Sequence, residues 1–192
     1  MKSNQLKLRQ ENYSIKKILS EVNQKKILLP SIQRTFVWDV KKIQNFCDSI
    51  FSNYPIGLFL FWKINRAARK KYNFYEFSKD VHKDYTAMKA KPTGNSTISV
   101  LDGQQRLTSL YCAFYGTHEY KLPKKHDLAR NYRKRVLCVN LFYDGKDNDK
   151  KDNPGAFQFE FREENDILTN KNELWFQMPD LVDWTGTGKS DA

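Results

Sequence analysis

The segment 100–108, which reads VLDGQQRLT, has the residue types of a phosphate-handling site. Asp102 and Gly103 form a turn dipeptide between an apolar run and the start of an amphipathic pattern. A helix start attracts phosphate because its first backbone N–H groups lack partners and its dipole is positive, and a glycine lets the ligand come close. Arg106 adds guanidinium donors that suit phosphate oxygens. The segment therefore predicts an anion site at a strand–helix junction.

The other polar side chains of this segment have the chemistry for hydrolysis. Asp102 could cap the helix, hold a metal ion or orient a water molecule. Gln104 and Gln105 could position a water molecule without changing charge. An Asp cap with an Arg–Asp ion pair on an ordinary helix would use the same residues. On this segment alone the structural alternative is the more common one, and the density of polar side chains around one glycine weakens it.

A second polar segment, 29–38, reads LPSIQRTFVW. Pro30 ends an apolar run, and the pair Gln33 and Arg34 is followed by the aromatic residues Phe36 and Trp38. A base or a sugar could stack on these rings while Arg34 meets a phosphate. The alternative is that both rings anchor a loop to the core.

The charge balance predicts an anionic partner. The chain of 192 residues has 33 Lys and Arg against 22 Asp and Glu, for a formal charge of +11. Such a basic surplus attracts nucleic acid or nucleotides. The basic runs 66–71 and 121–135 could contact DNA phosphates or serve only solubility. The residues that we predict to bind DNA are Lys124, Lys125, Arg130, Arg133, Lys134 and Arg135.

Other residues with possible chemistry receive structural interpretations. The three cysteines, Cys47, Cys112 and Cys138, lie in apolar runs without metal-ligand spacing, which predicts buried thiols and a reducing cytoplasmic location. No apolar stretch approaches the roughly 18 residues of a membrane span.

The histidines and the acidic loop do not predict a metal site. His82, His118 and His126 lie in basic loops, and we expect them to be solvated surface residues. The acidic loop 144–155 lacks the spacing of a calcium loop, so a solvated hairpin turn is expected.

Hydrophobic periodicity predicts the elements that position these motifs. Helices are expected from Ser14 to Asn23, from Asp39 to about Asn53, and after residue 103. The apolar stripe of the third helix comprises Leu107, Leu110, Tyr111 and Phe114. Strands are expected at 26–30, 57–62, 97–101 and, as a β-hairpin, at 136–143 and 157–161.

Three segments carry more specific expectations. The apolar run 57–62 is continuous, which is typical of a strand covered on both faces. Residues 64–96 are predicted to be a basic, partly ordered insertion that is helical between Tyr75 and Met88. The tail 184–192 is rich in Gly, Ser and Thr and is expected to be disordered. The order of elements indicates a single mixed α+β domain over residues 1–183.

The two polar segments together resemble the N-terminal domain of GmrSD-type restriction endonucleases, a bacterial family with a ParB/sulfiredoxin-like fold. The family pattern has a Pro, then Gln-Arg, an aromatic residue and a Trp, and later Asp-Gly-Gln-Gln-Arg-Leu-Thr. The matching residues are Pro30, Gln33, Arg34, Phe36, Trp38 and 102–108.

The resemblance implies a small mixed sheet flanked by helices, a C-terminal β-hairpin, and a part in phage defence against modified DNA. In relatives this domain binds and hydrolyses a nucleoside triphosphate (GTP or another nucleotide) with Mg²⁺, and it regulates a nuclease domain. By this likeness Asp102, Gln105 and Arg106 are predicted to be catalytic, with Asp102 as the metal ligand. The predicted nucleotide-binding residues are Gln33, Arg34, Gly103, Gln104 and Thr108.

The chain departs from the family pattern at two points. Ile32 stands where relatives often have an aromatic residue, and no His-Asn-His nuclease segment occurs here. The nuclease is therefore expected to be a domain or subunit outside this chain. Two alternatives stay open: a non-catalytic DNA-binding module that recognises a phosphate or a modified base, and a ParB-like nuclease, which the lack of an obvious carboxylate pair disfavours.

Overall fold

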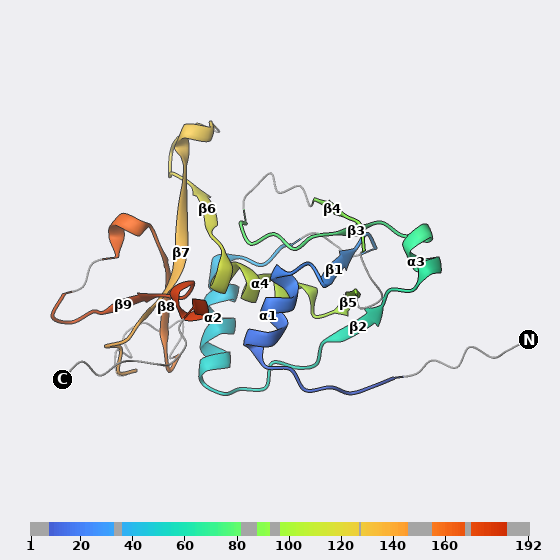
Figure 1. Ribbon diagram of the computed structural model, residues 1–192. Helices are drawn as coiled ribbons and strands as arrows, with labels where there is room; N and C mark the ends of the chain where they lie inside the picture. The colour runs from blue at the N-terminus through green and yellow to red at the C-terminus, as the bar shows by residue number, and fades with distance from the viewer. Residues whose placement is uncertain are drawn as a thin grey trace, which may run out of the picture.

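The elements expected from the sequence assemble into two β-sheets with helices between them (Figure 1). The computed structural model describes residues 8–32, 36–81, 88–92, 97–126, 128–145, 155–167 and 170–183. Gln33, Arg34, His82 and the tail 184–192 lie outside these residues, so the predictions made for them are not addressed by the structure.

The first sheet carries both polar motifs. Its strand order is β2-β5-β1-β3-β4, with β1 parallel to β5 and the other neighbours antiparallel. Ile27 lies beside Ile98, so the ends of β1 and β5 open on the same edge of the sheet. The strands are β1 (Ile27–Pro30), β2 (Leu60–Lys63), β3 (Phe74–Tyr75), β4 (Lys89–Ala90) and β5 (Ile98–Asp102).

The second sheet is antiparallel and is built around one long strand. Its strands are β6 (His118–Lys121), β7 (Tyr132–Asn140), β8 (Gln158–Arg162) and β9 (Trp175–Gln177). The start of β7 pairs with β6, and its end pairs with β8 and β9. The predicted hairpin is therefore confirmed, although β7 begins four residues earlier than expected because β6 supplies an unpredicted partner.

The helices begin where their caps predict. The side chains of Ser14 and Asp39 accept hydrogen bonds from the backbone N–H groups of Lys17 and Lys42, at 3.2 and 2.8 Å. The helices are α1 (Ile15–Asn23), α2 (Val40–Phe51), α3 (Arg66–Lys71), α4 (Gln104–Tyr115) and α5 (Asp180–Asp183), with short 3₁₀ turns η1 (Ala129–Asn131) and η2 (Glu164–Asp166).

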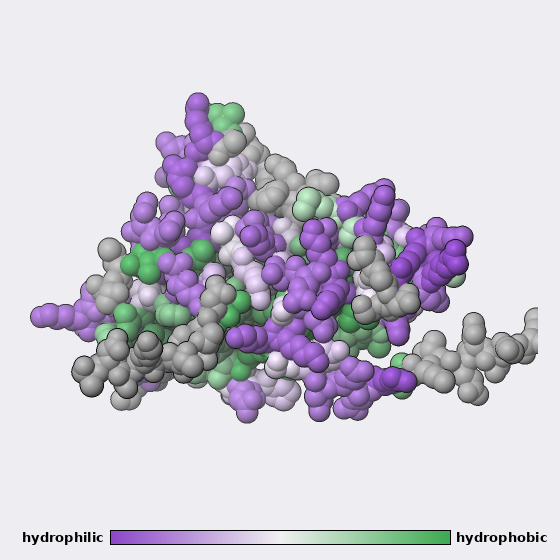
Figure 2. Space-filling view, in the orientation of Figure 1, coloured by the Kyte–Doolittle hydropathy of each residue, from purple (hydrophilic) through white to green (hydrophobic). Residues whose placement is uncertain are grey.

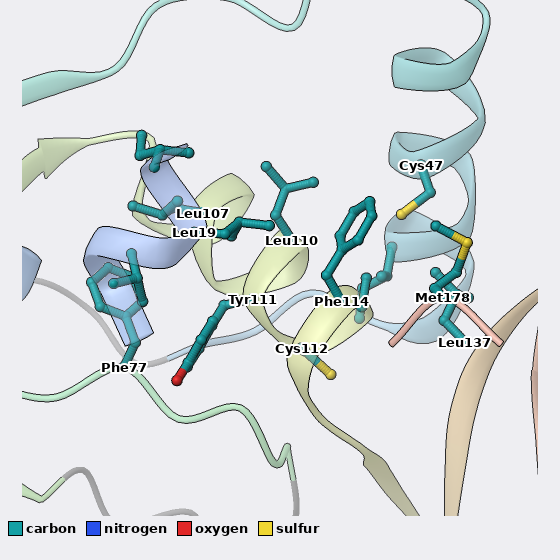
Figure 3. Close-up of a cluster of buried hydrophobic side chains, with 14 of the residues drawn as sticks. Leu19, Cys47, Phe77, Leu107, Leu110, Tyr111, Cys112, Phe114, Leu137 and Met178 are labelled. Atoms are coloured by element: carbon teal, nitrogen blue, oxygen red, sulfur yellow. The ribbon is translucent and has the colours of Figure 1, made fainter. Parts of the chain in front are cut away.

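The core surrounds α4. Figure 3 shows Leu107, Leu110 and Phe114 of this helix among side chains from both halves of the molecule. The predicted stripe is buried as expected, and so are most other positions of the helix, including four polar ones. A helix buried on all sides holds the residues at its start in fixed positions.

The three cysteines are buried, as predicted. Burial raises the pKa of the Cys47 thiol far above its usual value. The same cause raises the pKa of Cys112 to about 12 and that of Cys138 to about 11. All three thiols are therefore protonated and serve as small apolar side chains.

The prediction that 57–62 is a strand covered on both faces is wrong. β2 begins at Leu60 and lies at the edge of the first sheet. Leu58 and Leu60 are 83% and 48% exposed, whereas Phe59 and Phe61 pack on the core. The hydrophobicity of a run does not reveal which of its faces finds a partner.

The predicted helix between Tyr75 and Met88 is also wrong over its described part, 75–81. Tyr75 belongs to β3, which pairs with β4 and extends the first sheet. Phe77 is buried, and the Asp80 carboxylate accepts hydrogen bonds from the backbone and side chain of Thr117. These distant contacts outweigh the local helical pattern.

The mixed α+β fold class is confirmed, while the ParB/sulfiredoxin likeness stays a prediction. Within the described parts of the chain, no helix is long and apolar enough to cross a membrane.

Candidate functional site

The DGQQR segment lies at the junction of β5 and α4, as predicted. Asp102 ends β5, and Gly103 is the N-cap residue of α4 in the left-handed conformation with φ of +89°. No side chain caps this helix, so Asp102 is not the cap that its position suggested. The Asp102 side chain is instead 72% exposed, and its Oδ2 lies 3.2 Å from Arg106 Nη2. An exposed carboxylate beside an arginine is open to a ligand or a metal ion.

Arg106 holds the loop that precedes β2. Its Nη1 donates to the carbonyl oxygen of Ile56 at 2.5 Å, and its Nη2 donates to that of Leu58 at 2.9 Å. The guanidinium also lies over the Phe59 ring, 4.9 Å from its centroid. Hydrogen bonds from a charged donor contribute about 1.5–3 kcal/mol. Arg106 is therefore a structural clamp in this conformation.

Two glycines make room for this clamp. A Cβ on Gly57 would lie 2.7 Å from Arg106 Nη1, and one on Gly103 would overlap Phe59 and lie 3.2 Å from Arg106 Nη2. Both residues have positive φ, a conformation that costs other L-residues about 1–2 kcal/mol. Glycine is required at both positions because the guanidinium and the Phe59 ring occupy the space of a side chain.

Gln105 joins the two motifs. Its Oε1 accepts a hydrogen bond from the backbone N–H of Val37 at 2.9 Å, across 68 residues of sequence. The side chains of Gln104 and Gln105 are both buried. The loop that follows Gln33 and Arg34 is thus attached to the first turn of α4, although those two residues are themselves outside the described part of the chain.

Thr108 has a buried hydroxyl one turn further along α4. The residue is 4% exposed, and its Oγ1 has no hydrogen-bond partner within the described residues. Buried hydroxyl groups are nearly always hydrogen-bonded to protein or to water. This oxygen can therefore serve a ligand or a water molecule, and it lies on the same helix face as Gln104.

The aromatic residues of the first motif anchor their loop. Phe36 and Trp38 pack against the core, and the Trp38 ring meets Phe46 edge-to-face with centroids 5.3 Å apart. This arrangement matches the anchoring alternative rather than an exposed stacking platform.

Asp102 is the residue that we predict to hold a metal ion at this site. In the described residues no group of three or more His, Cys, Asp and Glu side chains could hold a metal ion. A Mg²⁺ ion commonly uses one or two protein carboxylates together with substrate phosphates and water. Asp102 fits that pattern, and its metal role stays a prediction.

A cavity of about 170 Å³ lies elsewhere, between α2 and the second sheet. Lys41 and Asp48 of α2 line it together with Phe157 and Glu160. The Asp48 carboxylate accepts from the backbone N–H of Phe157 at 2.8 Å, so it is part of the connection between α2 and the sheet. None of the lining residues belongs to either motif.

The predicted DNA-binding residues lie at the start of β7 and on the connection between β6 and β7. Lys124, Lys125, Arg130, Arg133 and Lys134 are exposed. Arg135 is different: its guanidinium lies over the Tyr120 ring at 4.6 Å and the Phe161 ring at 5.6 Å.

His118 is not the solvated residue that we expected, whereas His126 is exposed. The His118 ring contacts Phe161, and Arg135 Nη2 lies 3.5 Å from its Nδ1. Burial, reinforced by the Arg135 charge, lowers the pKa of His118 to about 4. His118 is therefore a neutral packing residue at neutral pH.

Sequence reasoning missed the partners of the motif. The carbonyl groups of Ile56 and Leu58, the Phe59 ring and the Val37 amide carry no distinctive side-chain signal. Gly57, the first residue of the apolar run 57–62, is a local sign of an unusual backbone conformation in this loop.

These features define a mixed α+β domain with a polar site at a strand–glycine–helix junction. The chain belongs to the family described as the GmrSD restriction endonuclease, N-terminal domain, whose model matches residues 15–183. It is also 31% identical over 111 residues to an uncharacterized protein of Methanocaldococcus jannaschii. That match covers 57% of this chain and 18% of the relative, so the chain corresponds to a small part of the relative's length.

Proposed function

We propose that this chain is a nucleotide-binding, NTP-hydrolysing regulatory domain of a modification-dependent DNA restriction system. The observation that carries the proposal is the junction of β5 and α4, where the exposed Asp102 carboxylate adjoins a glycine helix start. The Thr108 hydroxyl, which has no hydrogen-bond partner within the described residues, lies one turn further along the same helix. Family membership supports the restriction system as the setting.

The proposed mechanism is electrostatic. The N–H groups at the start of α4 and the Arg106 guanidinium bind the phosphates. Asp102 would hold Mg²⁺, which would offset the negative charge of the phosphates, and the Asp102 carboxylate could also orient the attacking water molecule. Gln105 acts as a positioning residue, because its Oε1 already accepts from Val37 and so keeps the first motif against the helix.

Phosphate binding competes with the contacts of Arg106. The guanidinium donates to Ile56 and Leu58, so a phosphate that recruits it must weaken its hold on this loop. Nucleotide binding is then coupled to the edge of the first sheet, where Leu58 and Leu60 are exposed. Such coupling is what a domain that regulates a nuclease elsewhere requires.

A thermal-shift panel with GTP, ATP, CTP and UTP, with and without Mg²⁺, tests binding. At a ligand concentration of 100 times Kd the native state gains about 2.7 kcal/mol, which for a chain of this size raises Tm by about 5–10 °C. No shift with any nucleotide would reject the proposal.

Hydrolysis is tested with Asp102→Asn and with Glu164→Gln as the matched control. Both residues have exposed carboxylates. Among the described residues, the Asp102 side chain forms a hydrogen bond or ion pair only with Arg106. Asp102→Asn should abolish phosphate release with little change in Tm, whereas Glu164→Gln should leave it intact. Full activity in Asp102→Asn would remove this residue from the mechanism.

The second candidate is a non-catalytic DNA-binding module that recognises a phosphate or a modified base at the same site. It is favoured by the engagement of Arg106 with protein carbonyl groups, which gives this residue a structural role without any nucleotide. A salt titration of DNA binding distinguishes the two functions. Salt-sensitive DNA binding by a protein that shows no thermal shift with any nucleotide supports the module.

A further inference from the structure

The ribbon of β6 and the start of β7 projects from the body of the molecule. Residues 132–135 of β7 pair with His118–Lys121, whereas 136–140 continue into the sheet with β8 and β9. Figure 1 shows this two-stranded arm extending away from the helices, with η1 near its tip. We call residues 118–135 the β6–β7 arm. At about 3.4 Å per residue, its paired part of four residues per strand is about 14 Å long.

The β6–β7 arm carries a large share of the basic surplus. Its sequence has seven Lys and Arg against two acidic residues. Figure 2 shows hydrophilic residues gathered along it. Among the described residues, no salt bridge involves the exposed basic side chains of the arm. These side chains are Lys121, Lys124, Lys125, Arg130, Arg133 and Lys134.

The register of the strands separates anchoring residues from exposed ones. His118 lies opposite Arg135 and Tyr120 opposite Arg133, so these four side chains share one face. Arg135 stacks on Tyr120 and Phe161 there, and the Tyr120 hydroxyl donates to the Glu163 carboxylate. This aromatic and charged cluster holds the base of the arm against β8. Arg135 is therefore an anchor, in contrast to our sequence prediction for it.

The remaining basic side chains point to solvent. Lys134 lies on the face opposite Arg135, and Lys121 shares that face because it is across from Tyr132. Lys124 and Lys125 lie in the turn beyond Lys121. The Arg133 guanidinium is partly engaged within the protein, because its Nη1 donates hydrogen bonds to the carbonyl groups of Arg130 and Tyr132 at 3.0 Å. Among the described residues, the side chains of the four lysines and of Arg130 take part in no hydrogen bond or salt bridge, and the lysines are the ones chosen for the test.

We propose that the β6–β7 arm binds the backbone of double-stranded DNA, lying along the major groove with its lysines on the flanking phosphates. The major groove of B-form DNA, about 12 Å wide, admits a two-stranded β-ribbon. The major groove of A-form RNA is too narrow for side chains to enter. The choice of DNA rests on the proposed restriction function, while the arm is separate from the nucleotide site and needs no nucleotide to bind.

The test compares two variants of the full chain that each lose four positive charges. The arm variant carries Lys121→Ala, Lys124→Ala, Lys125→Ala and Lys134→Ala. The control variant carries Lys63→Ala, Arg66→Ala, Lys70→Ala and Lys71→Ala, all exposed positions in and beside α3. Figure 1 shows α3 at the opposite side of the molecule from the arm. Thermal melting checks that both variants fold.

Fluorescence anisotropy measures binding to a DNA duplex of about 25 base pairs at increasing salt concentration, without nucleotide. A duplex of this length lets the arm meet phosphates on both sides of one groove. Each lost phosphate contact lowers the slope of log K against log salt by about 0.9, so the arm variant should lose about 3–4 in slope. The control should keep its slope to within about 1. Equal losses in the two variants, or an unchanged slope in the arm variant, would overturn the proposal. Tighter binding to a duplex RNA of the same length would also overturn it.

The nucleotide assays keep this proposal separate from the proposed function. The arm variant should retain its thermal shift with nucleotide and its phosphate release, because no arm residue belongs to the site at α4. Arm-dependent DNA binding in a protein without any nucleotide response supports the arm and rejects the NTPase. A nucleotide response together with DNA binding that does not depend on the arm supports the NTPase and rejects the arm proposal.

Discussion

The substitution Gly103→Ala tests whether the start of α4 is as crowded as the structure indicates. Gly103 has φ of +89°, and an added Cβ would overlap Phe59 Cδ1 and lie 3.2 Å from Arg106 Nη2. The backbone conformation costs an alanine about 1–2 kcal/mol. Forcing a methyl group into a filled space costs about 1–3 kcal/mol more. The free energy of unfolding should therefore fall by about 2–5 kcal/mol.

Gly145→Ala is the matched control, because it separates the two costs. Gly145 has φ of +72°, and no atom of the described residues lies within 4 Å of the position of its Cβ. Gly145→Ala therefore has the same cost of positive φ as Gly103→Ala, and both substitutions reduce the conformational entropy of the unfolded chain to the same extent. The difference between the two variants, about 1–3 kcal/mol, then reports the crowding alone.

Urea denaturation followed by circular dichroism measures both variants, and unchanged m-values indicate that the midpoints reflect stability. A double variant with Phe59→Ala completes the test. Gly103→Ala should cost less in that background, because the overlapping ring is gone. Equal costs for Gly103→Ala and Gly145→Ala would refute the close packing of Phe59 and Arg106 on this glycine.

Three further predictions concern the clamp, the arm and a helix cap. Arg106→Lys should lower the free energy of unfolding by about 2–3 kcal/mol, because lysine cannot bridge the carbonyl groups of Ile56 and Leu58 as a guanidinium does. An unchanged urea midpoint would contradict the structural role of Arg106. The pKa of His118 falls from 6.5 in the unfolded chain to about 4 in the folded protein, so the unfolded chain takes up the proton first and stability declines as pH drops from 6.5 to 4. The loss of stability is at most about 3 kcal/mol and, after solvent screening of this half-buried ring, about 1–2 kcal/mol. His118→Asn should flatten this part of the pH–stability curve. An equally steep curve in the variant would assign the decline to other groups. Asp39→Ala should destabilise by about 1 kcal/mol in thermal melts through loss of the bond to the Lys42 N–H, and a value near zero would show that α2 does not depend on its cap.

The local elements could be predicted from the sequence because their determinants are neighbours along the chain. Ser14 and Asp39 cap helices through the residue three positions on, and the stripe of α4 follows from helical spacing. Gly103 at the end of an apolar strand predicted a strand–helix junction, and the structure has one. The two polar motifs were likewise sufficient to identify the family.

The tertiary structure alone decided what these residues contact. Arg106 finds its partners 48 and 50 residues away, and Gln105 finds Val37 at a distance of 68 residues. These partners are backbone groups, which every residue carries, so no pattern of side chains announces them. For the same reason the apolar run 57–62 did not reveal an edge strand, and the basic run 121–135 did not reveal that Arg135 packs on Tyr120 and Phe161 while its neighbours face solvent. The sequence by itself determined which groups are present and where helices begin; burial, pairing and exposure depended on segments that meet only in the folded chain.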